Sequence, residues 1–433
     1  MTSGQISAAA AFQALLTPAG QWLLAQADAA EIEADPLAAA TRLRRAAETD
    51  GAFPAGPGGE TAGTAELVNA AMTQARLRGR AREKFGAAAD RMYFTPAGLE
   101  QATRGVVARY RAHRFALGVT VPEGSMVGDL CCGIGADLTA LARAGVPVEG
   151  VDLDPVTAAV AAANVEALGL GDLARVREGD VTHTPPGRYA AVLCDPARRG
   201  RRGRIFDPDS YAPPWRTVLD LARGAPAACV KAAPGLPHEL VPPDATAEWI
   251  SVDGEVKEAA LWFGPLRGAP RQATLLRDTR PGPGASGDGP AAPAVLVADP
   301  GLGDPPVAAP RRYLYEPDGA VVRAHLVAEA AARVDGALLD PHIAYITADR
   351  LVPTPFCRAY EVLEVLPFSL KRLRAVLRER RVGIVTIKKR GSAVDVERLR
   401  RDLRPSGPNS VVVVLTRVGD RPICLLCAEV SAT

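Results

Sequence analysis

The segment Val127–Asp137, which reads VGDLCCGIGAD, constrains the fold of this chain more than any other part. It joins a short apolar run to a turn that contains Gly133 and Gly135, and glycine lets the backbone come close to a ligand. A second apolar run, VEGVDLDP at Val148–Pro155, follows after a helical stretch. Repeated strand–helix units of this kind predict a parallel α/β sheet with right-handed crossovers and a ligand site at the carboxyl ends of its first strands.

The turn does not match the dinucleotide-binding fingerprint G-x-G-x-x-G, because Leu138 stands three residues after Gly135. An acidic residue at the end of the second strand suits ribose hydroxyls, since a carboxylate accepts two hydrogen bonds. We assign Asp152 to that role. Asp154, followed by Pro155, is typical of a helix N-cap with a first-turn proline. A capping role for Asp152 itself is the alternative.

Changes in the pattern of helix and strand signals along the chain predict four regions. Residues 1–120 are expected to be a helical domain, because strong strand runs are absent there. Residues 121–280 alternate strands and helices, and residues 281–355 begin with a Pro/Gly-rich linker and form a bridging segment. Residues 356–433 read β-α-β-α-β-β, which suits a small ferredoxin-like domain.

The composition limits the kinds of partner that the protein can bind. The formal net charge is only +2, so any nucleic-acid site must be a local basic patch. No signal peptide and no apolar run of about 18 residues is found, so we expect no membrane span. Seven cysteines without framework spacing favour a reducing cytoplasm, and Cys424 and Cys427 are read as strand residues rather than metal ligands.

The motifs then resemble a known family. D-x-C-C-G-x-G-x-D, V-D-x-D-P, E-G-D at Glu178–Asp180 and D-P-A-R at Asp195–Arg198 occur in the order found in class I S-adenosylmethionine (SAM) dependent methyltransferases. More narrowly, KFGAAADRMYFTPAGLEQATR, VKAAPGLP and LPFSLKRLRAVLRERRVGIVTIKKRG resemble bacterial methyltransferases with a C-terminal THUMP-like domain. The resemblance implies a Rossmann-like seven-stranded sheet.

The resemblance also implies a SAM site. The turn would face the methionine part of SAM, Asp152 would bind the ribose, and the adenine would lie at the third strand. Cysteine replaces the usual first glycine of the turn, which is tolerable if its φ angle is negative. The implied cofactor-binding residues are Asp129, Cys131, Gly133, Gly135, Asp137, Asp152, Asp180 and Val181.

The implied acceptor site follows the fourth strand of the sheet. Methyl transfer needs an aligned, unprotonated nucleophile. Enzymes that methylate exocyclic amines of bases carry a (D/N)PP(Y/F/W) loop, whereas this loop has neither the second proline nor the aromatic residue. Phe206, Tyr211 or Trp215 would supply the ring, or the loop arginine would stack on the base. The expected catalytic residues are Asp195, Pro196, Arg198 and Lys231.

Two points stay open at the acceptor site. Methylation at carbon 5 of uracil is an alternative, because those enzymes use a DPPR-type loop, but it needs an attacking thiolate. Cys229 is placed for that role, although its apolar neighbours favour a buried strand residue. Lys231 is either catalytic, a phosphate contact or part of a structural salt bridge.

Local basic segments indicate RNA. Arg199, Arg201 and Arg202 follow the acceptor loop and suit a polyanion. Between Lys371 and Arg404 there are 13 Lys and Arg against 4 Asp and Glu, and Lys388, Lys389 and Arg390 are expected nucleic-acid contacts.

The sequence therefore predicts a cytoplasmic SAM-dependent methyltransferase that modifies a base in tRNA or rRNA, without a metal. A small-molecule methyltransferase and a non-catalytic RNA-binding protein are the alternatives. The loop arginines speak against the first, and the intact SAM motifs speak against the second.

Overall fold

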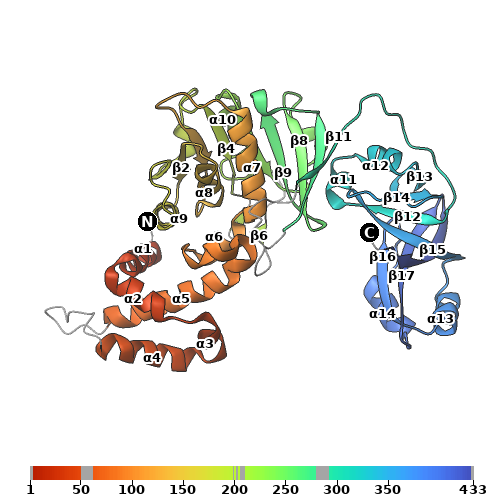
Figure 1. Cartoon of the computed structure of the whole chain (residues 1–433), viewed down its shortest axis with the longest axis horizontal. Coiled ribbons are helices and arrows are strands. Elements are labelled where there is room, and N and C mark those ends of the chain that lie inside the picture. Colours follow the sequence, from red (N-terminus) through yellow and green to blue (C-terminus); the bar gives the residue numbers. More distant parts are fainter. Residues whose placement is uncertain are drawn as a thin grey trace. The chain divides into compact units, whose positions relative to one another are not determined.

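The structure is a computed structural model, and it describes residues 3–49, 62–197, 199–200, 203–204, 210–278 and 292–430. The chain divides into two compact units (Figure 1). The first contains the residues up to Ala233 and Ala260–Arg267, and the second contains Pro234–Ala259, Gly268–Asp278 and the described chain from residue 292. Each unit is described by itself below.

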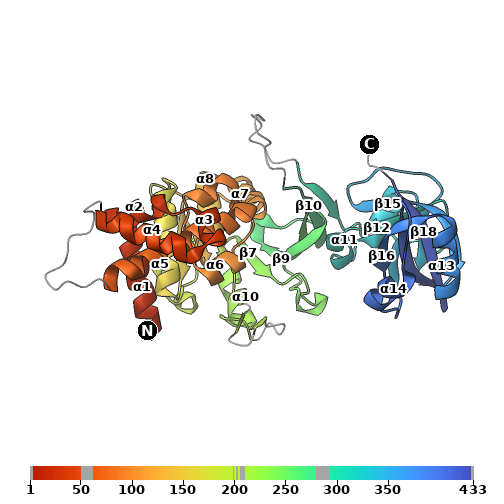
Figure 2. The same cartoon turned by 90° about the horizontal axis from the view of Figure 1, so that it is seen from below.

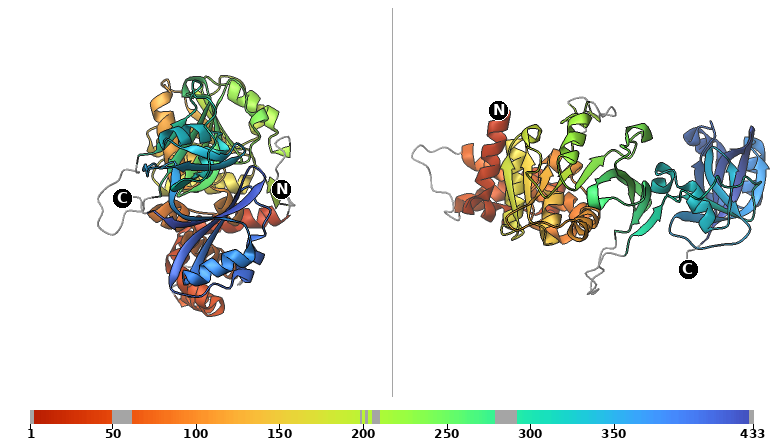
Figure 3. Two further views of the ribbon diagram at one scale, coloured as in Figure 1. Left: turned by 90° about the vertical axis from the view of Figure 1, so that its right-hand side faces the viewer. Right: turned by 90° about the horizontal axis from the view of Figure 1, so that it is seen from above.

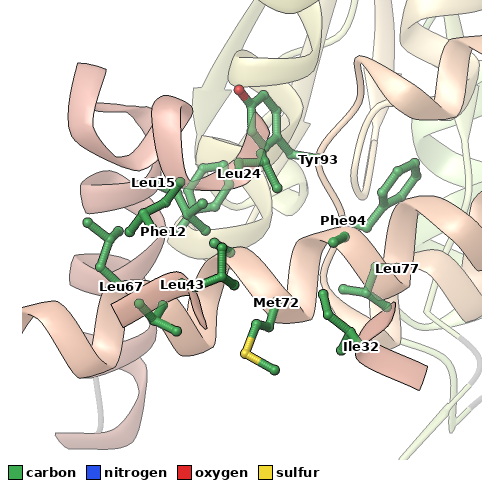
Figure 4. Close-up of a cluster of buried hydrophobic side chains, with 14 of the residues drawn as sticks. Phe12, Leu15, Leu24, Ile32, Leu43, Leu67, Met72, Leu77, Tyr93 and Phe94 are labelled. Carbon is green, nitrogen blue, oxygen red and sulfur yellow. The ribbon is translucent and has the colours of Figure 1, made fainter. Parts of the chain in front are cut away.

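The first unit begins with a helical region. Its helices are α1 (Ser3–Leu16), α2 (Pro18–Gln26), α3 (Ala29–Ala34), α4 (Pro36–Thr49), α5 (Ala62–Phe85), α6 (Pro96–Gln101) and α7 (Gly105–Gly118). Buried side chains such as Phe12, Leu43 and Met72 form its core, which Figure 4 shows.

This helical core is continuous with the sheet that follows it in the sequence. Val160 of helix α9 (Pro155–Ala167) belongs to the same hydrophobic cluster. The buried Asn164 side chain of α9 accepts a hydrogen bond from the backbone of Tyr93 and donates to the carbonyls of Tyr93 and Ile134. The helical region therefore packs as part of the first unit.

The central sheet has nine strands in the order β11-β10-β8-β9-β7-β4-β1-β2-β3. Strand β1 lies between β2 and β4 and is parallel to both. The order of the seven strands from β3 to β8 confirms the predicted Rossmann-like sheet, and β10 and β11 extend it. The strands are β1 (Val127–Leu130), β2 (Val148–Asp152), β3 (Ala174–Glu178), β4 (Ala191–Cys194), β7 (Ala228–Ala232), β8 (Thr246–Val252), β9 (Glu255–Phe263), β10 (Arg271–Leu276) and β11 (Ala294–Val297).

The first unit's helices follow the local rules expected from the sequence. Asp154 is the N-cap of α9, and its Oδ2 accepts the Thr157 backbone N–H at 2.9 Å, with Pro155 in the first turn. This confirms the predicted cap. Helix α8 (Ala136–Arg143) follows β1, and α10 (Trp215–Arg223) precedes β7. A short 3-10 helix, η2 (Val181–His183), follows β3.

The C-terminal part of the second unit is a seven-stranded sheet in the order β13-β14-β12-β15-β18-β17-β16. Helices α13 (Leu370–Glu379) and α14 (Val396–Leu403) cover one of its faces (Figures 2 and 3). The strands are β12 (Tyr313–Pro317), β13 (Ala337–Asp340), β14 (Ile343–Ala348), β15 (Cys357–Pro367), β16 (Val382–Lys389), β17 (Asn409–Val418) and β18 (Arg421–Glu429). Two short helices, α11 (Gly319–Arg323) and α12 (Val327–Arg333), lie between β12 and β13 in the sequence.

The β-α-β-α-β-β order expected after residue 356 is present from β15 to β18. The structure differs in what it adds to this sheet. Strand β12 pairs with β15, and β14 pairs with β12, so the segment expected as a bridge contributes three strands. The alternating strand pattern is short in this segment, and its membership of the sheet depends on long-range pairing that periodicity does not reveal.

Within the described ranges, no helix is long and apolar enough to cross a membrane.

Candidate active site

The glycine turn lies at the carboxyl end of β1, between the neighbouring ends of β2 and β4. Gly133 and Gly135 have φ angles of +58° and +84°, a region that favours glycine. A Cβ atom added to Gly133 would meet no atom within 4 Å, so the turn borders open space. Cys131 also has a positive φ, +63°, which corrects the expectation of a negative angle. The cysteine is held there because the Cys132 N–H bonds to the Val151 carbonyl at 3.1 Å, and this conformation costs about 1 kcal/mol or more.

Asp152, at the end of β2, stabilises this turn through hydrogen bonds. Its Oδ2 accepts the Gly133 N–H at 2.9 Å, and its Oδ1 accepts the Asp154 N–H at 3.0 Å. Burial raises the pKa of Asp152. A carboxylate oxygen has two lone pairs, so each can accept a further bond from a ribose hydroxyl.

An apolar side chain beside Asp152 was missed by sequence reasoning. Leu153 is 69% exposed although it lies between two partly buried acids. A leucine held at the rim of a ligand turn offers an apolar surface to a flat ring. The signal in the sequence was a single apolar residue between Asp152 and Asp154.

The residues expected at the adenine lie after β3. Asp180 is the N-cap of η2, and its Oδ1 accepts the Thr182 N–H at 2.9 Å and the Thr182 hydroxyl at 2.7 Å. These bonds lower the pKa of Asp180. Val181 is buried.

A buried cluster of charged groups, here called the Lys231 cluster, lies at the carboxyl ends of β1, β4 and β7. The Lys231 side chain is 3% exposed. Its Nζ donates to Asp195 Oδ2, to Asp137 Oδ2 at 3.2 Å and to Thr103 Oγ1 at 2.6 Å. An ammonium has three N–H donors, so these three acceptors engage all of them. Of the alternatives for Lys231, this geometry favours a positioning cation over a phosphate contact.

Two residues of the Lys231 cluster come from the N-terminal helical region and were not foreseen. The Thr103 hydroxyl donates to Asp137 Oδ2 at 2.6 Å. The fully buried Arg111 on α7 donates to Asp137 Oδ1. Burial alone would raise the pKa of Asp137, but Arg111 and Lys231 outweigh it and hold the pKa at about 2. Asp137 is expected to bind the cofactor. In the structure both of its carboxylate oxygens bond to protein groups.

Asp129 on β1 is buried beside this cluster. Within the part of the chain that the structure describes, its Oδ2 is buried and has no hydrogen-bond partner. Burial, and next the negative charge of Asp137, raise the pKa of Asp129 well above its usual range. A buried oxygen without a partner is costly, so it fits a site that a ligand's donor group completes.

The acceptor loop begins at Asp195, whose backbone N–H bonds to the Leu130 carbonyl at 3.1 Å. Pro196 is buried, and Ala197 pairs with Ala212. The expected residues Arg198, Arg201, Arg202 and Phe206 lie outside the described residues. The backbone of Arg199 pairs with that of Arg204 in a two-stranded hairpin, β5 (Arg199–Gly200) and β6 (Gly203–Arg204).

Two of the aromatic rings expected to stack on the base belong to the described residues. Tyr211 and Trp215 are both buried and pack edge to face, with ring centroids 6.2 Å apart. Neither ring has an open face at the surface. Cys229 is fully buried in the hydrophobic core on β7, which agrees with its interpretation as a strand residue.

The basic tripeptide of the second unit is engaged by protein groups. Lys388 pairs with Glu316 at 3.0 Å, and Lys389 donates to the Val394 carbonyl at 3.0 Å. Arg390 donates to the Ala344 carbonyl at 2.8 Å and lies over the ring of Tyr345. These bonds anchor the three side chains to neighbouring strands and loops.

Among the described residues, no group of three or more His, Cys, Asp or Glu is placed to hold a metal. Cys424 and Cys427 are buried free thiols on β18.

The strand order, the glycine turn after β1 and the acid after β2 define the class of Rossmann-like methyltransferases. Comparisons with known proteins agree. The chain is 40% identical over 354 residues to an uncharacterised SAM-dependent methyltransferase of Mycobacterium tuberculosis, covering 79% of this chain and 91% of that protein. The chain therefore belongs to the SAM-dependent methyltransferases, and SAM is its cofactor.

Two further proteins extend the comparison. A 23S rRNA (uracil(1939)-C(5))-methyltransferase, RlmD, of Acidithiobacillus ferrooxidans is 36% identical over 94 residues, which is 20% of this chain and 21% of that protein. A crystal structure from Porphyromonas gingivalis W83, assigned to the methyltransferases, superposes with a TM-score of 0.65 at 21% identity. It covers 85% of this chain and 92% of that chain, which shows a shared fold.

Two family models match parts of the chain. Residues 357–429 match the THUMP domain-like family, which spans β15 to β18. Residues 8–53 match a domain of unknown function (DUF8688).

The site fits SAM by its own features. The open space beside Gly133 allows close approach to the turn, and the unpartnered Asp129 Oδ2 suits an ammonium donor. Asp152 and Leu153 offer a carboxylate for hydroxyls and an apolar surface for a ring. When bound, SAM supplies an electrophilic methyl group on a sulfonium.

Proposed function

We propose that this protein methylates a nitrogen of a base in structured RNA, either tRNA or rRNA. The observation that carries the chemistry is the Lys231–Asp195 contact at the carboxyl end of β4. Lys231 is buried, whereas the Asp195 side chain is 25% exposed. The buried Lys231 thus holds the Asp195 carboxylate from the protein side. The exposed part of the carboxylate faces the place proposed for the methyl acceptor.

In this proposal Asp195 accepts a hydrogen bond from the amine of the base. That bond orients the nitrogen lone pair toward the methyl group, and alignment of this kind is the main demand of an in-line transfer. Lys231 holds the carboxylate in place from the buried side. Pro196, buried after Asp195, makes the loop stiff at this point.

Nitrogen is favoured over carbon 5 of uracil by the cysteines. Attack on the uracil ring needs a thiolate. Cys194 and Cys229, on the strands that end at the acceptor edge, are fully buried, and burial raises the pKa of Cys194. The match to the RlmD relative extends over only 94 residues, so the activity of that protein supports an RNA substrate more than a target atom.

RNA as the substrate is supported by three features. A named rRNA methyltransferase is among the relatives, residues 357–429 match the THUMP domain-like family, and the basic excess lies between Lys371 and Arg404. Phosphate contacts by basic side chains dominate the affinity of proteins for RNA and DNA. Arg199, Arg201 and Arg202 beside the acceptor loop remain proposed RNA contacts.

The substrate is tested by comparing RNA from a strain that lacks this protein with wild-type RNA. Nucleoside mass spectrometry is expected to show one methylated base missing from tRNA or rRNA. Purified protein with labelled SAM is expected to restore it. If no RNA fraction differs, the RNA substrate is refuted, and a small-molecule acceptor becomes the better explanation.

The residue roles are tested by two variants. Asp152→Ala is expected to remove SAM binding in calorimetry, because both the turn and the ribose contact depend on it. Asp195→Ala is expected to bind SAM normally and to lose transfer. Unchanged SAM affinity of Asp152→Ala, or unchanged transfer by Asp195→Ala, would refute the corresponding assignment.

A further inference from the structure

The outer surface of α13 and α14 is strongly basic. The apolar sides of these helices bury Leu373, Leu377, Leu399 and Leu403 against the C-terminal sheet. The opposite sides carry exposed cations that make no ion pair with any described residue. They are Lys371, Arg372, Arg378, Arg400 and Arg401 on the helices, and Arg381 and Arg404 just beyond the helix ends.

Other basic side chains of the same segment bond to acidic side chains or to backbone carbonyls. Arg380 pairs with Glu364 at 2.8 Å, and Arg374 on α13 donates to the Asp402 carbonyl on α14 at 2.6 Å. Lys388, Lys389 and Arg390 have the partners described above. These exposed cations thus differ from their neighbours and outnumber the exposed acids of the two helices, Glu379 and Glu397. Solubility does not require such an excess of one sign.

An independent observation concerns the ends of both helices. Arg381, two residues after the end of α13, and Arg404, directly after α14, adopt left-handed conformations with φ angles of +53° and +44°. Glycine or asparagine normally occupies this position, because a side chain there is strained. Arginine at both positions indicates that these side chains have a function, and that this function offsets the backbone strain.

The end of α13 lies beside the loop that follows α14. The backbone N–H of Asn409 bonds to the Arg381 carbonyl at 3.2 Å, and its side chain donates to the Arg380 carbonyl at 2.8 Å. A Cβ atom on Gly407 would lie 2.1 Å from the Arg381 carbonyl oxygen. Arg381 therefore lies at the starts of β16 and β17, beside the short loop that Arg404 begins.

We infer that the α13–α14 face, with Arg381 and Arg404 at its edge, is the surface that docks the phosphate backbone of RNA, and this inference rests on the proposed function. Guanidinium groups fit phosphate oxygens in a fork geometry. A membrane surface fits less well, because none of the large exposed apolar side chains of the described chain lies on α13 or α14. In this arrangement Lys388, Lys389 and Arg390 support the domain, and the helix face contacts the RNA.

The main test uses the full-length protein with R372Q/R378Q/R400Q/R401Q. The matched control, R44Q/R45Q/R333Q/R350Q, removes the same charge from exposed positions elsewhere. The probe is mixed tRNA, and its affinity is measured from 50 to 200 mM salt. The helix-face variant is expected to bind about tenfold more weakly or worse and to lose about 3 from the salt slope, at about 0.7 to 0.9 for each lost phosphate contact. The control is expected to stay within about twofold.

Two outcomes separate the inference from the proposed function. If the wild type and the helix-face variant bind tRNA with equal affinity and slope, the docking face is refuted while RNA binding stands. If the wild type binds no RNA at low salt yet binds SAM, the proposed function fails as well. Binding to vesicles with an anionic headgroup, in place of RNA, would also overturn the inference.

A second variant, R381G/R404G, tests the strain argument. Glycine relieves the left-handed conformation, so the thermal midpoint is expected to stay equal or rise. The affinity for mixed tRNA is nevertheless expected to fall several-fold. A lower midpoint with unchanged tRNA affinity would show that these arginines serve only the fold.

Discussion

The two units use arginine and lysine in opposite ways. In the first unit Arg111 and Lys231 are buried, and each contacts carboxylates of the Lys231 cluster. In the second unit seven exposed cations make no ion pair with any described residue, five on α13 and α14 and two just beyond their ends. Burial makes an unpaired charge very costly, whereas water screens an exposed one. The buried cations therefore position other groups, and the exposed ones remain available to a partner.

The largest expected effect comes from breaking a buried pair. Arg111→Met leaves Asp137 without its strongest partner, and removing one member of a buried pair typically costs about 3 to 5 kcal/mol. Arg372→Met makes the same chemical change on the exposed face and is expected to stay within about 0.5 kcal/mol of the wild type. Urea unfolding followed by circular dichroism measures both. Equal losses of stability in the two variants would show that burial does not separate the roles of these cations.

An intermediate effect is expected at Thr103, which joins Lys231 to Asp137. Thr103→Val removes hydrogen bonds to charged groups, worth about 1.5 to 3 kcal/mol, and the methyl-transfer rate at saturating SAM is expected to fall about tenfold or more. Thr103→Ser keeps the hydroxyl and is expected to restore the rate. The rates of the two variants and their SAM affinities form the test. A serine variant as slow as the valine variant would contradict a role for the hydroxyl.

The smallest expected effect is a pH dependence of SAM affinity. The pKa of Asp129 is raised in the free protein, so the folded site binds a proton over a pH range where the ordinary carboxyl does not. A cationic ligand group beside Asp129 favours ionisation, so binding releases that proton and affinity rises as pH increases toward the raised pKa. Calorimetry from pH 5 to 8 in two buffers of different ionisation enthalpy measures the release. Asp129→Asn is expected to remove this dependence, and an unchanged dependence would contradict it.

Much of the fold followed from local patterns in the sequence. The glycine turn, the Asp154 cap and the alternating elements of residues 357–429 depend on neighbouring residues, and the structure confirms the Rossmann-like sheet and the cap. The strands from Tyr313 to Ala348 were not assigned to the C-terminal sheet, because membership of that sheet is a long-range property.

The acceptor side of the site was harder to predict. Lys231 and Asp195 were named, but Thr103 contacts Lys231 from 128 positions away in the chain, and no local pattern marks such a pair. Cys131 was expected with a negative φ, whereas the turn imposes +63°. Lys388, Lys389 and Arg390 are expected as nucleic-acid contacts, and the sequence did not reveal their protein partners, because Glu316 and Ala344 come from other strands.

The origin of Thr103 and Arg111 in the N-terminal helical region has a consequence for how such enzymes diversify. A chain that exchanged this region for an unrelated one would lose two partners of Asp137 and leave the charges around Lys231 unmatched. The sheet that holds the methyl donor is thus no interchangeable module, and the residues before β1 are expected to be inherited together with it.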